Sequence, residues 1–218
     1  MSMTKEMTSG KPYKLILSFA IPLILGNVFQ QLYNMVDTVI VGKFVGVNAL
    51  AGVGSTGAIN FLVIGFALGI CSGFSIMIAQ RFGAGDYSGM RKFIANSIYL
   101  CIAVAVILTA VTMLLTKPIL TVMNTPKEIY DYAYNYIIII FAGISATMFY
   151  NILSGILRAV GDSRTPLIFL GVSSVLNVGL DLLCIIVFKM GVAGAGIATV
   201  ISQAISAFLC LIYIRKNY

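Results

Sequence analysis

Six long apolar stretches, separated by short polar breaks, dominate this chain of 218 residues. An α-helix rises about 1.5 Å per residue, so about 20 apolar residues cross the roughly 30 Å hydrocarbon core of a bilayer. The breaks between the stretches carry Lys, Arg, Gly, Pro or Asp, which end helices and prefer water. The sequence therefore predicts an all-α integral membrane protein, a bundle of six transmembrane helices over residues 15–41, 49–79, 93–115, 129–157, 166–188 and 192–214.

The composition excludes an ordinary soluble domain. Hydrophobic residues make up 60% of the chain, charged residues only 10%, and the mean hydropathy is +1.02. The apolar run over residues 15–41 is too long for the core of a cleaved signal peptide. We therefore expect the N-terminal segment, residues 1–14, to be retained.

The net charge of +7 could indicate a nucleic-acid partner, but its distribution favours a membrane orientation. With the N-terminus placed inside, ten basic residues fall on the inner segments and four on the outer loops, as the positive-inside rule requires. We predict a multi-pass protein of the cell membrane, in contact with lipid and not with nucleic acid, with both termini cytoplasmic. The inner residues are Lys5, Lys11, Lys14, Arg81, Arg91, Lys92, Arg158, Arg164, Arg215 and Lys216, and the outer ones are Lys43, Lys117, Lys127 and Lys189.

Residues that commonly carry catalysis are scarce. The sequence has no histidine, no phosphate-binding loop, no nucleophile elbow and no metal-spaced cysteine cluster. The cysteines at 71, 101, 184 and 210 lie in apolar stretches without a CxxC pair, so we interpret them as small buried residues, with no disulfide or metal implied. We predict a protein that is not an enzyme and has no cofactor. Any proton chemistry near neutral pH must use carboxylates.

Two of those carboxylates, Asp37 and Asp181, lie inside apolar stretches. A charged Asp at the centre of a spanning helix costs about 2.5–3.5 kcal/mol, and such residues usually face a bundle interior or a water-filled cavity. Counted from Lys43 and Lys189 at about 1.5 Å per residue, the two acids lie about 9 and 12 Å inside the outer loops. Counted inward from Lys127 and Lys189, Tyr136 and Thr199 lie at about 13–15 Å. Four polar groups therefore reach one layer.

Each of these groups continues a polar stripe at helical spacing, which indicates a surface that lines a cavity. The stripes are Gln30, Tyr33 or Asn34, then Asp37; Ser174, Asn177 and Asp181; Thr199, Gln203 and Ser206; and Thr147, Asn151 and Ser154. The acids could bind a proton, or they could bind Na⁺ together with Asn177 and Thr199, because such oxygen donors suit a small hard cation. They could also simply hydrogen-bond neighbouring helices. The residue types leave these alternatives open.

Three further patterns concern the backbone. Pro22 lies inside the first apolar stretch, where it removes a helical hydrogen bond, and a purely structural bend and a functional hinge both fit it. Gly65, Gly69 and Gly73 form a four-residue repeat that allows close helix packing. The similar segments RFGAGD (81–86) and RAVGD (158–162) are explained by a turn followed by a helix cap.

Five segments together resemble a known family. AIPLILGNVFQQLYNMVDTVIVGKFVG (20–46), AQRFGAGD (79–86), LRAVGDSRTP (157–166), NVGLDLL (177–183) and GVAGAGIATVISQ (191–203) are similar to the N-terminal half of a MATE (multidrug and toxic compound extrusion) transporter. The likeness covers nearly the whole chain, in order and at matching spacing. It is greatest to the branch with two acids in the N-lobe, sometimes called DinF-like.

The resemblance implies a secondary antiporter that exports organic compounds, often cationic, in exchange for H⁺ or Na⁺. In that branch an acid on the first helix, an Asn and an Asp on the fifth and a Thr on the sixth form the cation site, which corresponds to Asp37, Asn177, Asp181 and Thr199 here. Ala195 would lie near the backbone carbonyl that contributes to the cation site, and Tyr136 corresponds to a tyrosine of the same site in the family. Pro22 would correspond to a protonation-linked bend. Gln30, Tyr33 and Asn151, with Asn34 as the neighbouring stripe position, would line the substrate cavity.

MATE transporters have twelve helices in two lobes, so the resemblance implies that this chain is one lobe, with residues 215–218 beginning the linker. We expect it to need a second lobe, or a second copy of itself. Two alternatives remain. A flippase for lipid-linked precursors, from a related branch, would need basic residues to hold pyrophosphate, and the first, second, fifth and sixth stretches have none. A bundle that assembles with partners without transporting would not need the acids.

Overall fold

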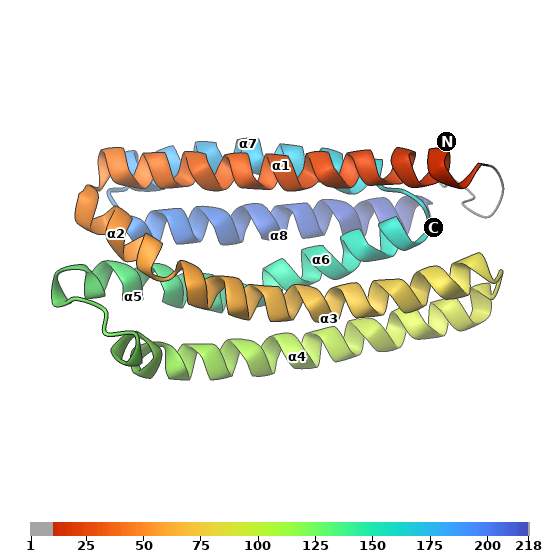
Figure 1. Cartoon of the computed structure of the whole chain (residues 1–218), viewed down its shortest axis with the longest axis horizontal. Helices are drawn as coiled ribbons and strands as arrows, with labels where there is room; N and C mark the ends of the chain where they lie inside the picture. The colour runs from red at the N-terminus through yellow and green to blue at the C-terminus, as the bar shows by residue number, and fades with distance from the viewer. Residues whose placement is uncertain (1–10, 218) are drawn as a thin grey trace.

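The computed structural model describes residues 11–217 and, over that range, consists of helices joined by short turns, with no strand (Figure 1). Five helices are long and apolar enough to cross a membrane, or six if the bent pair α5 and α6 counts as one span. The prediction of an all-α membrane bundle is confirmed. The helices are α1 (Pro12–Phe44), α2 (Val47–Ser55), α3 (Gly57–Gly83), α4 (Tyr87–Val122), α5 (Lys127–Ala142), α6 (Ile144–Ala159), α7 (Arg164–Leu182), the π-helical turn η1 (Leu183–Val187) and α8 (Val192–Asn217).

Two of the expected helices are broken in the structure. In place of one helix over 49–79 there are α2 and α3, which meet at Thr56, whose hydroxyl donates to the Val53 carbonyl at 2.7 Å. In place of one helix over 129–157 there are α5 and α6, which meet at Gly143 with a bend of 45°. The sequence is apolar on both sides of each break, so hydropathy alone does not locate them. Helix α4 is also longer at both ends than the expected 93–115.

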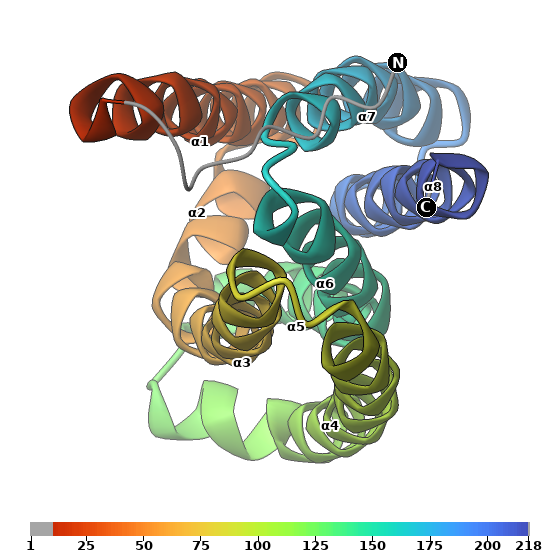
Figure 2. The same cartoon turned by 90° about the vertical axis from the view of Figure 1, so that its right-hand side faces the viewer.

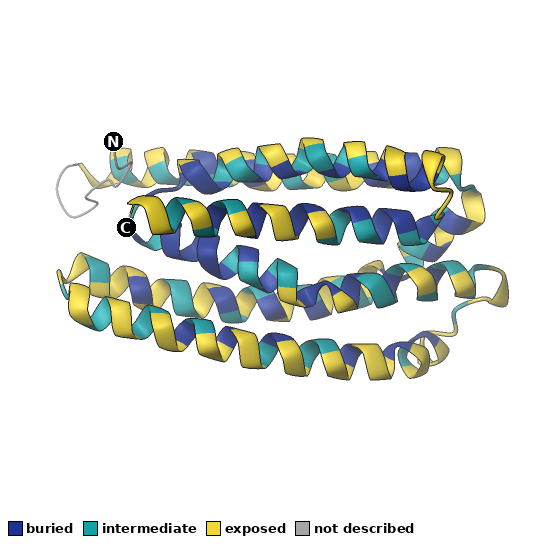
Figure 3. Cartoon of the chain, turned by 180° about the vertical axis from the view of Figure 1, so that it is seen from behind, coloured by how far each residue is buried: buried dark blue, intermediate teal, exposed yellow. Residues whose placement is uncertain are grey.

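The hydrophobic core is built around α6. Figure 2 shows α6 between α3, α4 and α8, with α1 and α7 side by side at one edge of the bundle. The α6 residues Met148, Ile152, Leu153 and Leu157 are almost completely buried, and they join buried residues of α3, α4, α5, α7 and α8 in one cluster. In Figure 3 buried residues lie on the inward sides of the helices and exposed ones on the outward sides. This pattern places apolar side chains against lipid on the outside of the bundle.

Both chain ends of the described range lie at the same end of the bundle, together with the α3–α4 and α6–α7 turns (Figure 1). In the first turn the Asp86 carboxylate accepts the backbone N–H of Gly89 at 2.8 Å and pairs with Arg81 at 2.6 Å. The hydrogen bond from the Gly89 N–H is the main reason why the pKa of Asp86 lies below its usual value. The hydrogen bond from the Arg81 side chain lowers this pKa further. In the second turn Asp162 accepts the N–H of Thr165 at 3.0 Å. The prediction of a turn and a helix cap is confirmed for both segments. Residues 1–10 of the predicted N-terminal segment, and Tyr218, lie outside the described residues.

Glycines permit close helix contacts, though not where the repeat in the sequence suggested. A Cβ added at Gly65, Gly69 or Gly73 would meet nothing within 4 Å, so no described part of the chain packs closely on this ridge. A Cβ at Gly143 would instead overlap the side chain of Val200 on α8. The break between α5 and α6 is therefore packed directly against α8.

We predict that Gly143→Ala destabilises the protein by about 1–3 kcal/mol, because the added methyl group overpacks the contact with Val200. Thermal unfolding in detergent measures this. Val200→Ala in the same chain should restore part of the loss, because it removes the overlapping methyl groups. Gly69→Ala is the control and should cost nothing, since its new Cβ meets open space. Equal stability of Gly143→Ala and Gly69→Ala would contradict the packing argument.

Candidate functional site

Three helices bring the two membrane acids together. Asp37 comes from α1 and Asp181 from the last turn of α7, and their side chains are 9% and 0% exposed. Thr199 on α8 donates its hydroxyl to Asp37 Oδ2 at 3.4 Å and accepts from Asn177 Nδ2 at 3.5 Å. The carboxyl groups of Asp37 and Asp181 are close enough to interact directly. The structure thus gathers all four residues into one site.

Several oxygen atoms in this site have no hydrogen-bond partner. They are Asp37 Oδ1, Asn177 Oδ1 and both carboxylate oxygens of Asp181, all buried. Buried polar atoms in proteins are nearly always paired, so a cluster of unpaired acceptors calls for a positive partner. A proton shared by the carboxyl groups would satisfy part of the cluster. An all-oxygen donor set of this kind also fits Na⁺, which would be held by Asp37, Asn177, Asp181 and Thr199.

Transition metals do not fit the same site. Within residues 11–217 no three His, Cys, Asp or Glu side chains lie together in a way that could hold a metal ion. The donors at the acids are oxygens of carboxyl, amide and hydroxyl groups, which favour hard cations.

An apolar cluster covers the site on the side away from the chain ends. Its buried members are Ile40, Val41, Ala49, Ile185, Val192 and Ala195, and Tyr136 on α5 packs against it. Tyr136 also lies within electrostatic range of both carboxylates. Ala195 is a buried member of the same cluster and lies one helical turn before Thr199 on α8. This side of the site is therefore lined by apolar residues.

The backbone of α7 changes just after the second acid. Helix α7 ends at Leu182, one residue beyond Asp181, and the chain continues as the π-helical turn η1. Such π-turns are rare and occur frequently at functional sites. Here the turn places Ile185 in the apolar cluster that covers the acids.

Polar side chains continue from the acids toward the middle of the bundle. A narrow pocket is lined by Tyr33, Ser173, Ser174, Asn177, Thr199, Ser202 and Gln203. The Tyr33 side chain interacts with those of Gln30 and Gln203, and Ser202 Oγ and Gln203 Oε1 are buried without partners. Gln30 and Tyr33 therefore belong to the same polar surface as the acids. The sequence prediction did not assign Ser173, Ser202 or Gln203 to the site, although Gln203 lies on the stripe of Thr199.

Three other predicted residues lie apart from the acids. Asn34 is exposed on α1 and donates to Gln31 Oε1 at 3.3 Å, so it belongs to a different face from Tyr33. Asn151 on α6 donates to the Thr147 carbonyl at 2.8 Å. Pro22 is buried, and α1 continues through it without a break. Among residues 11–217, no hydrogen bond joins Asn34, Asn151 or Pro22 to either carboxylate.

The chain is similar to known proteins along nearly its whole length. The model of the MatE family matches residues 22–183. The chain belongs to the MatE family. A relative from Bacillus subtilis (strain 168), named probable multidrug resistance protein YpnP, is 33% identical over 212 residues, which cover 97% of this chain and 48% of the relative. The chain thus spans about half the length of the curated relatives that it matches.

Solved MATE structures have the same fold. An outward-facing multidrug resistance MATE family transporter of the MOP superfamily matches with a TM-score of 0.91 and 28% identity, over 100% of this chain and 48% of that one. A MOP superfamily transporter from Pyrococcus furiosus Vc1, described as having reverse polarity of its binding pocket, matches with a TM-score of 0.91 and 28% identity. The match covers 98% of this chain and 47% of that one. Members of the MatE family are transporters and not enzymes. The predicted resemblance to one MATE lobe is confirmed.

The exposed side of α1 carries a second polar stripe that the sequence reading did not separate from the first. Asn27, Gln31, Asn34 and Thr38 are all exposed and follow helical spacing. Amide side chains in contact with hydrocarbon cost free energy, so we expect this stripe to face water or protein and not lipid. The apolar exposed face of α1, with Phe29 and Val36, lies on another side of the helix.

We predict that a single cysteine at Gln31 or Asn34 reacts with a membrane-impermeant maleimide at least tenfold faster than one at Phe29 or Val36. The reason is that a thiol reacts as a thiolate in water and hardly at all in hydrocarbon. The measurement needs a background in which the four native cysteines are replaced by alanine. Equal labelling rates at all four positions would show that α1 has no water-facing side.

Proposed function

We propose that this chain is one lobe of an exporter of small, often cationic organic molecules, driven by exchange for H⁺ or Na⁺ at Asp37 and Asp181. One observation carries the proposal: the two acids and Asn177 leave four buried oxygens without partners, where α1, α7 and α8 meet. Two neighbouring buried carboxylates repel each other unless a proton or cation compensates their charge. The site therefore has a built-in preference for binding a positive ion.

The helix contacts suggest how binding of the ion changes the lobe. Helix α1 packs mainly on α7 and makes far fewer contacts with α8. Only 6% of the residues in the most apolar 18-residue stretch of α1 are buried within the lobe. A cation between Asp37 and Asp181 ties α1 to α7 and α8, and loss of the cation restores the repulsion. Because Pro22 cannot donate a backbone hydrogen bond, α1 has a weak point at which it can bend in response. We infer that ion binding is coupled to the position of α1.

The proposed exporter needs a second lobe. The relatives are about twice as long as this chain, and α1 presents both apolar residues and the polar stripe around Gln31 to its surroundings. A second six-helix lobe, or a second copy of this chain, would cover that face and form the substrate cavity with Gln30, Tyr33, Asn34 and Asn151. Parallel repeats about an axis along the membrane normal are a common plan for such transporters.

The proposed orientation places both termini in the cytoplasm of a cell membrane. The bundle end at which α1 begins and α8 ends is also where α3 and α6 end and α7 begins (Figure 1). Arg81 and Arg158 lie in the last turns of α3 and α6, and Arg164 is the first residue of α7. The positive-inside rule assigns this end to the cytoplasm. The apolar cluster around Ile40 and Ala195 then lies on the outer side of the acids, and the polar pocket at Gln203 on the inner side.

The two alternatives are less well supported. A flippase that holds pyrophosphate would need positive charge, whereas the residues lining the polar pocket include no Lys or Arg and lie beside two acids. A bundle that only assembles with partners would gain nothing from unpaired carboxylate oxygens, which weaken the fold.

We predict that Asp37→Asn and Asp181→Asn each abolish the ion dependence of substrate binding. The probe is the fluorescent cation ethidium, titrated with and without Na⁺ and at several pH values, on this chain in nanodiscs and on a chain that carries a second lobe. Asparagine keeps the side-chain shape but binds neither a proton nor Na⁺ as a carboxylate does. Asp131→Asn is the matched control, because Asp131 is exposed near the start of α5. Unchanged ion dependence in both membrane variants would overturn the assignment and favour a non-transporting bundle.

Thr199→Val distinguishes the two coupling ions. The change removes one oxygen ligand while it keeps the side-chain volume, and a lost hydrogen bond or ligand to a charged group costs about 1.5–3 kcal/mol. If Na⁺ is the coupling ion, its affinity should fall by about 10- to 100-fold, measured with ²²Na⁺ binding. If H⁺ is the coupling ion, the pH profile of substrate binding should shift much less. A variant with unchanged Na⁺ affinity and an unchanged pH profile would contradict a role for Thr199.

A further inference from the structure

A second polar layer lies one helical turn from the acid site, on the same three helices. Tyr33 comes four residues before the acid of α1, and Ser173 comes four residues before Asn177 on α7. Gln203 follows Thr199 by four residues on α8, which runs in the opposite direction (Figure 1). Four helical residues rise about 6 Å, so this layer lies about 6 Å from the acids, toward the bundle end where α1 begins. The inner layer consists of Tyr33, Ser173, Ser202 and Gln203.

Two oxygen atoms of the inner layer are buried without a hydrogen-bond partner. They are Ser202 Oγ and Gln203 Oε1, and these residues are only 2% and 5% exposed. The neighbouring hydroxyl of Ser173 is paired, because its Oγ donates to the Ser202 carbonyl at 2.9 Å. Buried polar atoms in proteins are nearly always paired, so two unpaired oxygens on neighbouring residues indicate a position at which a ligand binds.

The unpaired oxygens share a narrow pocket with residues of the acid site. Asn177 and Thr199 line the same pocket, and the Thr199 hydroxyl donates to Asp37 Oδ2 at 3.4 Å. Every residue that lines this pocket carries a hydroxyl or a side-chain amide group. Oxygens of this kind suit hard cations such as Na⁺, and they also accept hydrogen bonds from a hydronium ion.

Tyr33 covers the pocket from the side of α1. The pocket has no room for a water molecule in this arrangement, and the Tyr33 hydroxyl interacts with the Gln203 side chain on α8. Helices α7 and α8 pack extensively on each other, whereas α1 makes few contacts with α8. A movement of α1 therefore separates Tyr33 from Gln203 more easily than α7 and α8 can separate, and it opens the pocket.

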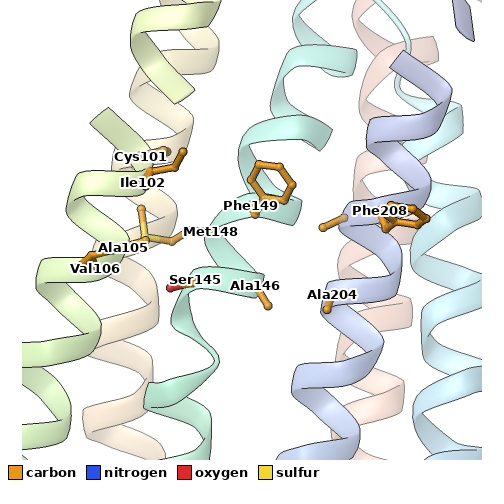
Figure 4. A pocket seen from close by; sticks show the side chains of 11 residues that line it. Cys101, Ile102, Ala105, Val106, Ser145, Ala146, Met148, Phe149, Ala204 and Phe208 are labelled. Carbon is orange, nitrogen blue, oxygen red and sulfur yellow. The ribbon is translucent and has the colours of Figure 1, made fainter. Parts of the chain in front are cut away.

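A cavity on the other side of α8 offers no equivalent route for an ion. It has a volume of about 370 Å³ and lies between α4, α6 and α8 (Figure 4). Its lining residues, among them Ile102, Val106, Phe149 and Phe208, are apolar except for Ser145. A cation that enters such a cavity loses its hydration without gaining oxygen ligands, so it is excluded. The polar pocket at the inner layer is the one that can pass an ion.

We propose that Ser202 Oγ and Gln203 Oε1 form a transient binding position for the coupling ion, which Tyr33 covers. This inference rests on the proposed ion exchange at Asp37 and Asp181. When α1 carries Tyr33 away from Gln203, a hydronium ion or Na⁺ moves between the acids and the inner layer. The two unpaired oxygens then replace part of its hydration. When Tyr33 returns, it separates the acids from the bundle end where α1 begins.

The test measures how fast the buried carboxyl protons exchange with solvent. The chain in nanodiscs, at a pH low enough to protonate the acids, is transferred into D₂O, and the isotope shift of the carboxyl infrared band is followed with time. Asp37→Asn and Asp181→Asn identify the band. Gln203→Met removes a ligand oxygen with little change in volume and should slow exchange about tenfold, the scale of one lost hydrogen bond. Tyr33→Phe weakens the cover while it keeps the ring, and it should speed exchange by about the same factor.

Matched controls come from exposed residues of the same types. Gln80→Met on α3 and Tyr99→Phe on α4 should leave the exchange rate unchanged. Equal rates in Gln203→Met, Tyr33→Phe and the unaltered chain would overturn the inner position and leave the assignment of the acids intact. Slower exchange in Tyr33→Phe would contradict its role as a cover. If neither Asp→Asn change removed a carboxyl band, the ion site itself would be refuted, and the inner position with it.

Discussion

A carboxylate held away from water is stable only when something compensates its charge, and this bundle buries two carboxylates side by side. Three helices converge at Asp37 and Asp181, where Thr199 donates to Asp37 and accepts from Asn177. The available hydrogen bonds are long, and several oxygens stay unpaired. A purely structural polar contact would be expected to pair its atoms more completely. The incomplete pairing at the two acids therefore supports the proposed ion site over a purely structural contact between helices.

Helix α8 connects this site to the rest of the lobe. Thr199 contacts the acid on α1, while the next residue, Val200, packs on Gly143 at the break between α5 and α6. One turn earlier Gly196 lies against Ile139 and the Tyr136 carbonyl of α5. Interiors packed this densely transmit small displacements and do not absorb them. A shift of α8 by a few tenths of an ångström at Thr199 is therefore expected to move the bend between α5 and α6 as well as α1.

The sequence predicted the all-α membrane bundle, because lipid leaves few alternatives. A helix must be long and apolar to cross a bilayer, and a carboxylate within it stands out. It did not predict the breaks at Thr56 and Gly143, because the sequence is apolar on both sides of each break. It placed Asn34 beside Tyr33, since a stripe read at helical spacing is uncertain by one residue, and one residue is a rotation of about 100°. Cys71 on α3 and Cys101 on α4 meet in a tertiary contact that no local sequence pattern predicts.

The exposure of α1 gives the lobe its asymmetry. One side of α1 carries Tyr33 and Asp37 into the polar interior, a second carries Gln31 and Asn34 to the outside, and a third is apolar. A helix with three such sides cannot be satisfied by lipid alone, because the outer amides need water or protein. It also cannot be held firmly by its own lobe, since it packs mainly on α7. The helix that carries Asp37 of the proposed ion site is therefore only partly covered by its own lobe and borders the neighbouring space. In a transporter these properties belong together, because the ion can change the cavity only through a part of the lobe that touches both.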